Sequence, residues 1–507
     1  MNKQPNILWI FSDEHRPDVA GFAGNDTVRT QNLDQLAEQS IRFTNASCTS
    51  PVCTSSRMSL LCGKDIHNCA AWNNHWAIFP EHTTWPEHFA NHGYSTCLVG
   101  KMHFGGKDQL NGFQHRPYGD FRHGLGHQPD PLSKYPGYDN PQSGGITELP
   151  ESLLQDNIVT RESLAFLLEH HDKTPETPWF LCASYSRPHS PLTSPGRYFR
   201  RYQDKTPSAE VGIEHVDKLE NFAKKLVYDL SEEETVRGQQ GYYACVDFFD
   251  DCVGDLMTNL ENAGVLENTI IIYTSDHGEM LGQFGCWGKT LYYRPSIGVP
   301  LLISGPGISQ GEVLNHPISL IDIFPTMCSM AGLPIPEGLD GKDYSQVLKE
   351  PDTAKCPREY TFSSYYRYGI RLKYGATSDI TPESAWRCVN NEKWKYVDVE
   401  NGTELLFDLE NDPLELTNIG DKPEHQQLKQ KMKNWLYQDF SWEKVHQQIA
   451  DDRERLPQYL SGHFPGTPNQ YMLKDGRVFD AEKSLYDARW LHIQPGLTGG
   501  IIPQQFG

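Results

Sequence analysis

Short apolar runs rich in β-forming residues alternate along this chain with segments of helix length, and this alternation restricts the fold more than any other feature. The candidate strands are residues 6–12, 94–99, 179–184, 269–274 and 299–304. The candidate helices are residues 30–40, 83–91, 156–170, 232–263 and 321–330. Near-continuous apolar strands separated by helices are typical of a parallel sheet that is covered on both sides. The sequence therefore predicts an α/β fold with a large, mostly parallel sheet and helices on both faces.

A smaller second unit is expected after this sheet. Residues 387–397 and 403–408 have the pattern of short antiparallel strands, and residues 423–440 have that of an amphipathic helix. We predict a first domain over residues 1–355 and a C-terminal α+β subdomain over residues 356–440. The subdomain should contain an antiparallel sheet of the four-stranded type and a helix.

The final stretch, residues 441–507, is rich in Pro, Gly and Gln and contains scattered aromatic residues. A tail of this kind either wraps the domain to which it is attached or crosses to another subunit. The second arrangement would make the protein a homo-oligomer held together through its C-terminal tail.

Charge, hydropathy and cysteine usage exclude several classes of partner. The formal net charge of −21 argues against nucleic acid, whose phosphates require a basic surface. No segment approaches the run of about 18 apolar residues that spans a membrane. The apolar run at residues 7–11 is too short for a signal-peptide core, and the 12 cysteines lack the regular spacing of a disulfide framework. We expect a cytoplasmic protein that binds neither nucleic acid nor membrane, provided that Met1 is the natural start.

Polar residues directly follow three of the predicted strands. They are Asp13-Glu14, Lys101 with His103, and Asp276-His277. In open α/β sheets ligands bind beyond the carboxyl ends of the strands, so we expect these side chains to converge.

The two acidic pairs predict a site for a hard cation. Adjacent carboxylates such as Asp13 and Glu14 repel each other unless a cation lies between them. Oxygen ligands from these residues and from Asp276 would suit Ca²⁺ or Mg²⁺, whereas His277 is a less usual ligand and could instead hydrogen-bond the substrate. Taken singly, each carboxylate could equally be a helix cap or a turn residue.

Cys53 and Arg57 lie at the start of a further predicted helix. A nucleophile at position 53 would face backbone N–H groups and the positive helix end, which favour an anionic substrate. The alternative is a buried structural cysteine, which a lone cysteine usually is. Arg57, one turn along, could brace this turn or simply cover a solvated face.

Four further cationic or titratable residues could act on an anion. Lys101 and His103 are two positions apart and point the same way in an extended segment. His189 lies between two prolines, which hold it rigidly as a candidate general acid or as part of a structural turn. Lys289 could complete an anion clamp, although alone it would count for little.

Two stretches resemble the signatures of type I sulfatases, a family of the alkaline phosphatase superfamily. The string Gly93-Tyr-Ser-Thr-x-x-x-Gly-Lys-x-His103 resembles the second signature. Residues 51–63 resemble the first, which is built on Cys-x-Pro-x-Arg. The resemblance implies an alkaline-phosphatase-like fold and makes the first domain the catalytic sulfatase domain.

Later segments extend the resemblance. Residues 275–282 and 287–289 are similar to the family's metal-binding and sulfate-binding stretch, and residues 406–413 resemble its usual C-terminal subdomain. The order and spacing fit over residues 5–345. Residues 100–113 look most like the choline-sulfatase and phosphonate monoester hydrolase branch.

The resemblance implies a covalent cofactor and a metal ion. Cys53 would be oxidised to formylglycine by a formylglycine-generating or sulfatase-maturing enzyme, and its hydrated form would attack the sulfur of the ester. Ca²⁺ would be the usual metal, with Mg²⁺ or Mn²⁺ as alternatives. The implied metal ligands are Asp13, Glu14, Asp276 and His277.

The remaining candidates also receive roles from the resemblance. Arg57 and Lys101 would hold the modified residue and offset charge, and His103 would assist its turnover. His189 and Lys289 would contact the sulfate and protonate the leaving alcohol. Electrostatic stabilisation of charge on the transferring oxygens is usually the largest catalytic contribution.

The chain departs from the family pattern in three places. Ser55 stands where proline or alanine follows Cys-x, which bears on recognition by the maturation enzyme. Glu14 stands where a second aspartate is common, and Cys62 and Lys64 replace the usual Thr and Arg.

We therefore predict a sulfuric ester hydrolase that acts on a small organic sulfate or a sulfated saccharide. One alternative is a phosphonate or phosphate diester hydrolase that uses the same site. The other is a catalytically silent protein that binds a sulfated ligand while Cys53 remains unmodified.

Overall fold

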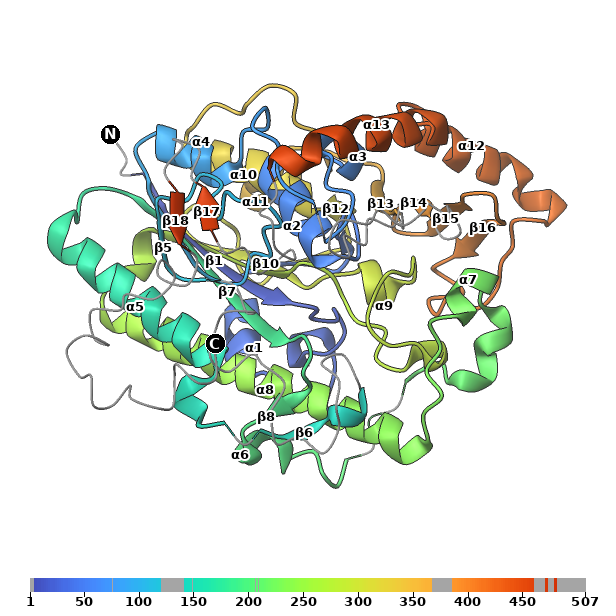
Figure 1. The fold of residues 1–507 in the computed structure, drawn as a ribbon, viewed down its shortest axis with the longest axis horizontal. Helices are drawn as coiled ribbons and strands as arrows, with labels where there is room; N and C mark the ends of the chain where they lie inside the picture. Colours follow the sequence, from blue (N-terminus) through green and yellow to red (C-terminus); the bar gives the residue numbers. More distant parts are fainter. Residues whose placement is uncertain are drawn as a thin grey trace.

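The computed structural model describes residues 4–74, 76–119, 141–147, 149–205, 207, 209–366, 385–459, 470–472 and 478–480 of the 507-residue chain. Among these residues, an eight-stranded sheet forms the centre of the molecule, with helices on both faces (Figure 1). Its strands follow the order β11 (Val313–Leu314), β2 (Ile41–Phe43), β10 (Leu301–Ser304), β9 (Thr269–Ser275), β1 (Asn6–Asp13), β7 (Trp179–Pro188), β4 (Ser95–Gly100) and β5 (His115–Tyr118). The predicted α/β fold with a large, mostly parallel sheet is confirmed.

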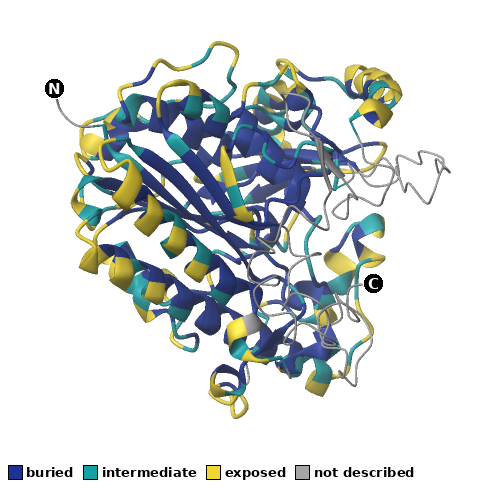
Figure 2. Cartoon of the chain, turned by 60° about the vertical axis from the view of Figure 1, so that its left-hand side comes forward, coloured by how far each residue is buried: buried dark blue, intermediate teal, exposed yellow. Residues whose placement is uncertain are grey.

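The central strands β9, β1, β7 and β4 run parallel, whereas β10 pairs with β9 in the antiparallel direction. They are buried on both faces, as the dark blue centre of Figure 2 shows, which explains their nearly continuous apolar sequence. Alternate residues of β1 enter different cores, with Trp9 and Phe11 in one and Leu8 and Ile10 in the other. This double burial fixes the register of each strand and hence the position at which it delivers the polar residues that follow.

Helices cover the two faces in separate groups. Helices α8 (Glu232–Asn262), α5 (Gln155–Lys173) and α1 (Gln31–Glu38) lie on one face, and α2 (Cys53–Cys62), α4 (Trp85–Asn91) and α10 (Ile323–Met330) lie on the other (Figure 1). Helix α8 begins at a capping box, in which the Glu234 amide donates to Ser231 Oγ at 3.2 Å and the Ser231 amide donates to Glu234 Oε2 at 2.9 Å.

The C-terminal unit contains a four-stranded antiparallel sheet, as predicted. Strands β13 (Thr361–Tyr365), β14 (Trp386–Asn390), β15 (Trp394–Val399) and β16 (Glu404–Asp408) pair in sequence order. Helix α12 (Gln426–Tyr437) packs on β14 and β15. The proposed boundaries at residues 355 and 440 stay predictions.

The predicted tail begins with a helix that the sequence analysis did not anticipate, α13 (Trp442–Arg455). This helix lies against the body of the molecule, where Trp72 Nε1 donates to Asp452 Oδ2 at 2.9 Å. Beyond it, Tyr459 packs on Phe79 with ring centroids 5.2 Å apart. Strands β17 (Gln470–Met472) and β18 (Val478–Asp480) form a two-stranded sheet. The rest of the tail lies outside the described residues, and a role between subunits stays a prediction.

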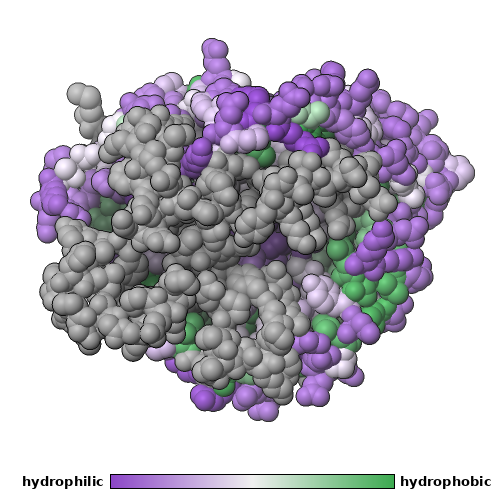
Figure 3. All heavy atoms as spheres, in the orientation of Figure 1, coloured by the Kyte–Doolittle hydropathy of each residue, from purple (hydrophilic) through white to green (hydrophobic). Residues whose placement is uncertain are grey.

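The described residues that are coloured in Figure 3 are mainly hydrophilic, with an apolar group near α7 (Asn221–Lys224). Ile213 and Tyr228 are among the large apolar side chains that are exposed in the described part of the chain. Within these same residues, no helix is both long and apolar enough to cross a membrane.

Candidate active site

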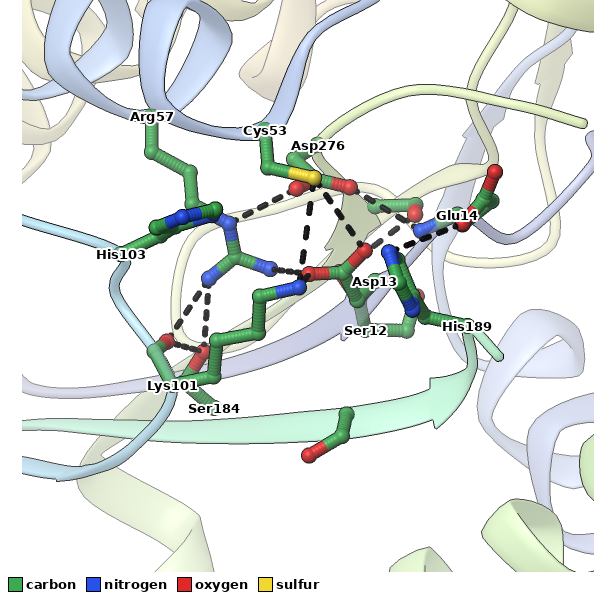
Figure 4. A network of polar contacts seen from close by, with 12 residues as sticks. Ser12, Asp13, Glu14, Cys53, Arg57, Lys101, His103, Ser184, His189 and Asp276 are labelled. Carbon is green, nitrogen blue, oxygen red and sulfur yellow. Dashed lines mark hydrogen bonds and ion pairs between the residues drawn. The ribbon is translucent and has the colours of Figure 1, made fainter. Parts of the chain in front are cut away.

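Four neighbouring strands deliver polar residues to one edge of the sheet. Asp13 is the last residue of β1, and Asp276 directly follows β9. Lys101 follows β4, and His189 follows β7. Because the four strands are parallel neighbours, their carboxyl ends coincide, and the structure brings these side chains together with Cys53 from α2 (Figure 4).

Arg57 ties three of these strand ends together from α2. Its Nη2 donates to Asp13 Oδ2 at 2.9 Å and its Nε donates to Asp276 Oδ2 at 2.7 Å. Its Nη1 donates to the carbonyl of Lys101 at 2.7 Å and to Ser184 Oγ at 3.0 Å. Burial lowers the pKa of Arg57, but the carboxylates of Asp276 and Asp13 raise it by more than burial lowers it. The pKa of Arg57 therefore lies above its usual value. Arg57 is therefore a permanently charged brace rather than an acid.

Asp13 forms ion pairs with two cations of the site. Besides Arg57, it forms an ion pair with Lys101 Nζ through Oδ2. Burial raises the pKa of Asp13, but Lys101, His189 and Arg57 together hold it well below its usual value. The carboxylate is therefore ionised at neutral pH.

Four candidate ligand atoms lie within 4.8 Å of one another, one each from Asp13, Cys53, Asp276 and His277. Arg57 binds Oδ2 of both aspartates, whereas Asp13 Oδ1 lies 3.7 Å from Cys53 Sγ and Asp276 Oδ1 accepts the backbone amides of Glu14 and His277 at 3.0 and 2.9 Å. His277 Nδ1 lies 2.9 Å from the carbonyl of Gly278, which leaves Nε2 on the side of the cluster. Ligands on opposite sides of Ca²⁺ lie about 5 Å apart, since each is about 2.4 Å from the ion, so the group fits one cation.

Glu14 takes a different place from the other three predicted ligands. Its backbone has φ 63°, and its Oε2 lies 2.9 Å from Lys289 Nζ and 3.3 Å from His189 Nε2. With Asp13 and His189 it forms a second group of candidate ligand atoms. Burial raises the pKa of Glu14 well above its usual value, although Lys289 opposes this shift. The structure thus places Glu14 between the cation cluster and Lys289.

Lys289 and His189 differ in charge. Burial lowers the pKa of Lys289, but Cys53, Glu14 and Asp13 outweigh this effect and hold the pKa well above its usual value. Burial and then the cations Lys101 and Lys289 lower the pKa of His189 well below its usual value. In this environment Lys289 is a cation and His189 a neutral imidazole.

Cys53 is the first residue of α2 and is 1% exposed. Its Sγ lies 3.2 Å from His277 Nε2 and 3.7 Å from Asp13 Oδ1. Burial, followed by the Asp13 carboxylate, raises the pKa of the Cys53 thiol to about 12. A thiol with such a pKa is almost entirely protonated at neutral pH and is a weak nucleophile. The unmodified side chain is therefore poorly suited to attack an ester.

His103 adjoins the start of α2 through its backbone. It has φ 58° and is buried, and its carbonyl accepts a hydrogen bond from Thr54 Oγ1 at 2.9 Å. The Thr54 amide donates to Asn74 Oδ1 at 3.0 Å. Asn74 was not among the predicted site residues, since nothing in its local sequence pattern indicates that its loop reaches the start of α2.

Ser184 and Glu279 were missed as well. Ser184 accepts from Arg57, and Glu279 Oε1 accepts the amide of Gly288 at 2.6 Å, next to Lys289. Glu279 stands in the same Asp-His-Gly-Glu string as Asp276, which was the available signal.

Residues 5–333 match the family described as Sulfatase. The chain belongs to the sulfatase family. Residues 282–441 also match the C-terminal region of N-sulphoglucosamine sulphohydrolases. The predicted membership is confirmed, and the protein is an enzyme of the sulfuric ester hydrolase class.

Two curated sulfatases are similar over most of the chain. A choline-sulfatase of Rhizobium meliloti is 31% identical over 441 residues, which cover 83% of each protein. An ulvan-active sulfatase of Formosa agariphila is 30% identical over 471 residues, which cover 90% of this chain and 84% of that protein.

Solved structures show the same fold. The phosphonate monoester hydrolase of Agrobacterium radiobacter has a TM-score of 0.74 at 22% identity, covering 94% of this chain and 99% of that one. A protein solved with its substrate D-glucosamine-2-N,6-O-disulfate has a TM-score of 0.68 at 21% identity, covering 89% of this chain and 99% of that one.

Proposed function

We propose that this sulfatase cleaves its ester with a formylglycine formed from Cys53 and with Ca²⁺ held by Asp13, Asp276 and His277. The observation that carries the proposal is the position of Cys53 Sγ, which shares a cluster of candidate ligand atoms with these three residues. A reactive group at position 53 would thus lie against both a divalent cation and Lys101, whose Nζ is 3.9 Å from Sγ.

The donor set favours a hard cation. Two of the three protein ligands offer carboxylate oxygens, which Ca²⁺ prefers, and Mg²⁺ or Mn²⁺ are the alternatives. When bound, the cation would stabilise negative charge on the sulfate and on the nucleophile. Glu14 would complete the coordination or hold Lys289 in place, since its carboxylate lies 2.9 Å from Lys289 Nζ.

The environment of Cys53 argues against the unmodified thiol as the nucleophile. The pKa of about 12 makes the thiol a weak nucleophile, so the chemistry needs a different group at this position. Formylglycine supplies an oxygen nucleophile when it is present. Because Cys53 is 1% exposed, a maturation enzyme would have to reach it before this part of the chain folds.

The other side chains would bind the sulfate and handle protons. Lys101 and Lys289 bring positive charge to the sulfate oxygens, and Arg57 keeps Asp13 and Asp276 oriented. Lys289 Nζ is protonated at neutral pH and could donate a proton to the leaving alcohol, alone or through His189 Nε2. We keep the predicted role of His103 in the turnover of the modified residue.

The substrate class follows from the relatives. Choline-sulfatase and ulvan-active sulfatase indicate a small organic sulfate or a sulfated saccharide as the two candidates. We also propose a cytoplasmic location, because none of the 12 cysteines, all of them among the described residues, lies in a disulfide, as is usual in a reducing compartment. The phosphonate or phosphate diester hydrolase and the silent binding protein remain the alternatives.

The proposal is tested first by mass spectrometry of the tryptic peptide 43–57, from protein made in a host that performs the modification. We expect formylglycine at position 53 and an unmodified thiol at Cys48, which lies on the same peptide. The same sample should turn over an aryl sulfate faster than an aryl phosphonate. An intact Cys53 together with full activity would show that formylglycine is not the nucleophile. A preference for the phosphonate would favour the phosphonate or phosphate diester hydrolase.

A further inference from the structure

The backbone on both sides of Lys289 lies in the left-handed region. Gly288 has φ 73° and Thr290 has φ 83°. Glycine adopts this conformation without steric cost, whereas a β-branched residue such as threonine rarely does. A strained residue of this kind persists only where the surrounding structure holds it.

Side chains from two parts of the chain hold the backbone around Lys289. On its N-terminal side, the Gly288 amide donates to Glu279 Oε1 at 2.6 Å. On its C-terminal side, the carbonyl of Thr290 accepts a hydrogen bond from Trp386 Nε1 at 2.9 Å. Trp386 is fully buried and belongs to β14 of the C-terminal sheet.

The C-terminal unit also holds the residues that follow. Lys395 Nζ donates to the carbonyl of Tyr292 at 3.0 Å, and the amide of Arg294 donates to Glu415 Oε2 at 2.7 Å. Lys395 and Glu415 form an ion pair with each other. The segment after Lys289 is therefore fixed from outside the catalytic sheet.

We infer that Trp386 is a positioning residue for Lys289. Its indole N–H holds Thr290 in the left-handed conformation, which directs the neighbouring Lys289 toward Glu14 and the reaction centre. This inference rests on the proposed contact of Lys289 with the sulfate and the leaving group. It gives the C-terminal sheet a part in the chemistry, although none of its described residues belongs to the cation cluster.

The experiment is a Trp386→Phe substitution in the matured full-length enzyme. Phenylalanine keeps ring packing against Tyr292, whose centroid lies 5.8 Å from that of Trp386, but it cannot donate to Thr290. Turnover should fall on the order of tenfold, as expected for a small displacement of a catalytic group. The fall should be larger for aryl sulfates with poor leaving groups, because these depend most on a proton donor. A loss of folded protein would reduce all substrates equally.

Two further variants make the test specific. Trp394→Phe removes an indole from the adjacent strand β15 and should leave turnover unchanged. Thr290→Gly added to Trp386→Phe should restore most of the turnover, since glycine adopts the left-handed conformation without the hydrogen bond. Unchanged turnover in Trp386→Phe, or no recovery in the double variant, would overturn the inference.

Lys289→Ala separates this inference from the proposed function. If Lys289→Ala does not change the dependence on the leaving group, the proposed role of Lys289 is wrong and the inference falls with it. If Lys289→Ala changes this dependence and Trp386→Phe does not, only the positioning role of Trp386 is wrong.

Discussion

Two buried groups of charged residues in this sulfatase have different roles. In the C-terminal unit, Lys395 and Glu415 form one ion pair whose remaining bonds go to backbone groups. At the edge of the central sheet, Asp13 and Asp276 both bind Arg57, and each also offers a carboxylate oxygen within 4.8 Å of Cys53 Sγ. An ion pair that binds only protein groups holds chain segments together. A cluster of candidate ligand atoms can in addition bind a metal ion.

The largest effect is expected from Lys101→Ala at the sheet edge. Turnover should fall about a thousandfold, as for the loss of one preorganised electrostatic contact in a dry site. The melting temperature should change little, because Asp13 keeps its bond to Arg57. Steady-state assays with an aryl sulfate and thermal unfolding measure the two quantities. The reverse pattern would make Lys101 a structural residue like Lys395.

In contrast to Lys101→Ala, Lys395→Met should mainly reduce the stability of the protein. The free energy of unfolding should fall by about 3 kcal/mol, because Glu415 would remain buried without its cation. Turnover per folded molecule should fall less than in Lys101→Ala. Urea unfolding gives the first quantity, and Lys395→Met with Glu415→Gln should recover part of the loss. A stability equal to that of the unaltered protein would contradict the comparison.

The two groups of candidate ligands at the sheet edge can be separated by their response to metal. A chelator should abolish activity, and Ca²⁺ should restore it. Asp276→Asn should raise the Ca²⁺ concentration for half-maximal activity about a hundredfold, and Glu14→Gln only about tenfold, as for a residue outside the ligand shell. Calcium titrations of activity and of melting temperature measure this difference. Equal shifts would put Glu14 among the direct ligands.

The smallest effect is expected on the pH dependence of stability, and it comes from His67. The Nδ1 atom of His67 lies 3.5 Å from Nη1 of Arg387 in the C-terminal sheet. Burial, followed by the charge of Arg387, lowers the pKa of His67 to about 3. The folded state therefore keeps His67 neutral while the unfolded chain takes up a proton below its ordinary pKa of about 6.5. Stability should decrease as pH falls from about 6.5 toward 3, by about 2 kcal/mol at pH 5 from this residue.

His67→Gln should weaken that pH dependence. Urea unfolding at pH 7 and at pH 5 measures it, with His215→Gln as a control at a partly exposed histidine. The same slope in the variant and the unaltered protein would show that His67 does not cause the loss.

The residues at the sheet edge could be predicted because local pattern and topology suffice for them. Asp13 and Asp276 follow apolar strands, and parallel neighbours must bring such residues together. The separate place of Glu14 depends on its positive φ and on Lys289, which is distant in sequence. The bond from Trp386 to Thr290 joins two structural units, so no pattern within either segment indicates it. Helix α13 was hidden by the polar composition of the tail, because its stable position depends on contacts such as Trp72 with Asp452.

The bond between Trp386 and Thr290 also has a consequence for the order of events during synthesis. Trp386 leaves the ribosome about a hundred residues after Lys289, and domains generally fold as they emerge. The central sheet can therefore assemble, and its strand ends can meet, before the lysine beside them is fixed. A nascent chain would pass through a stage in which the central sheet is complete but Lys289 is not yet positioned. This stage would end only when the C-terminal sheet forms.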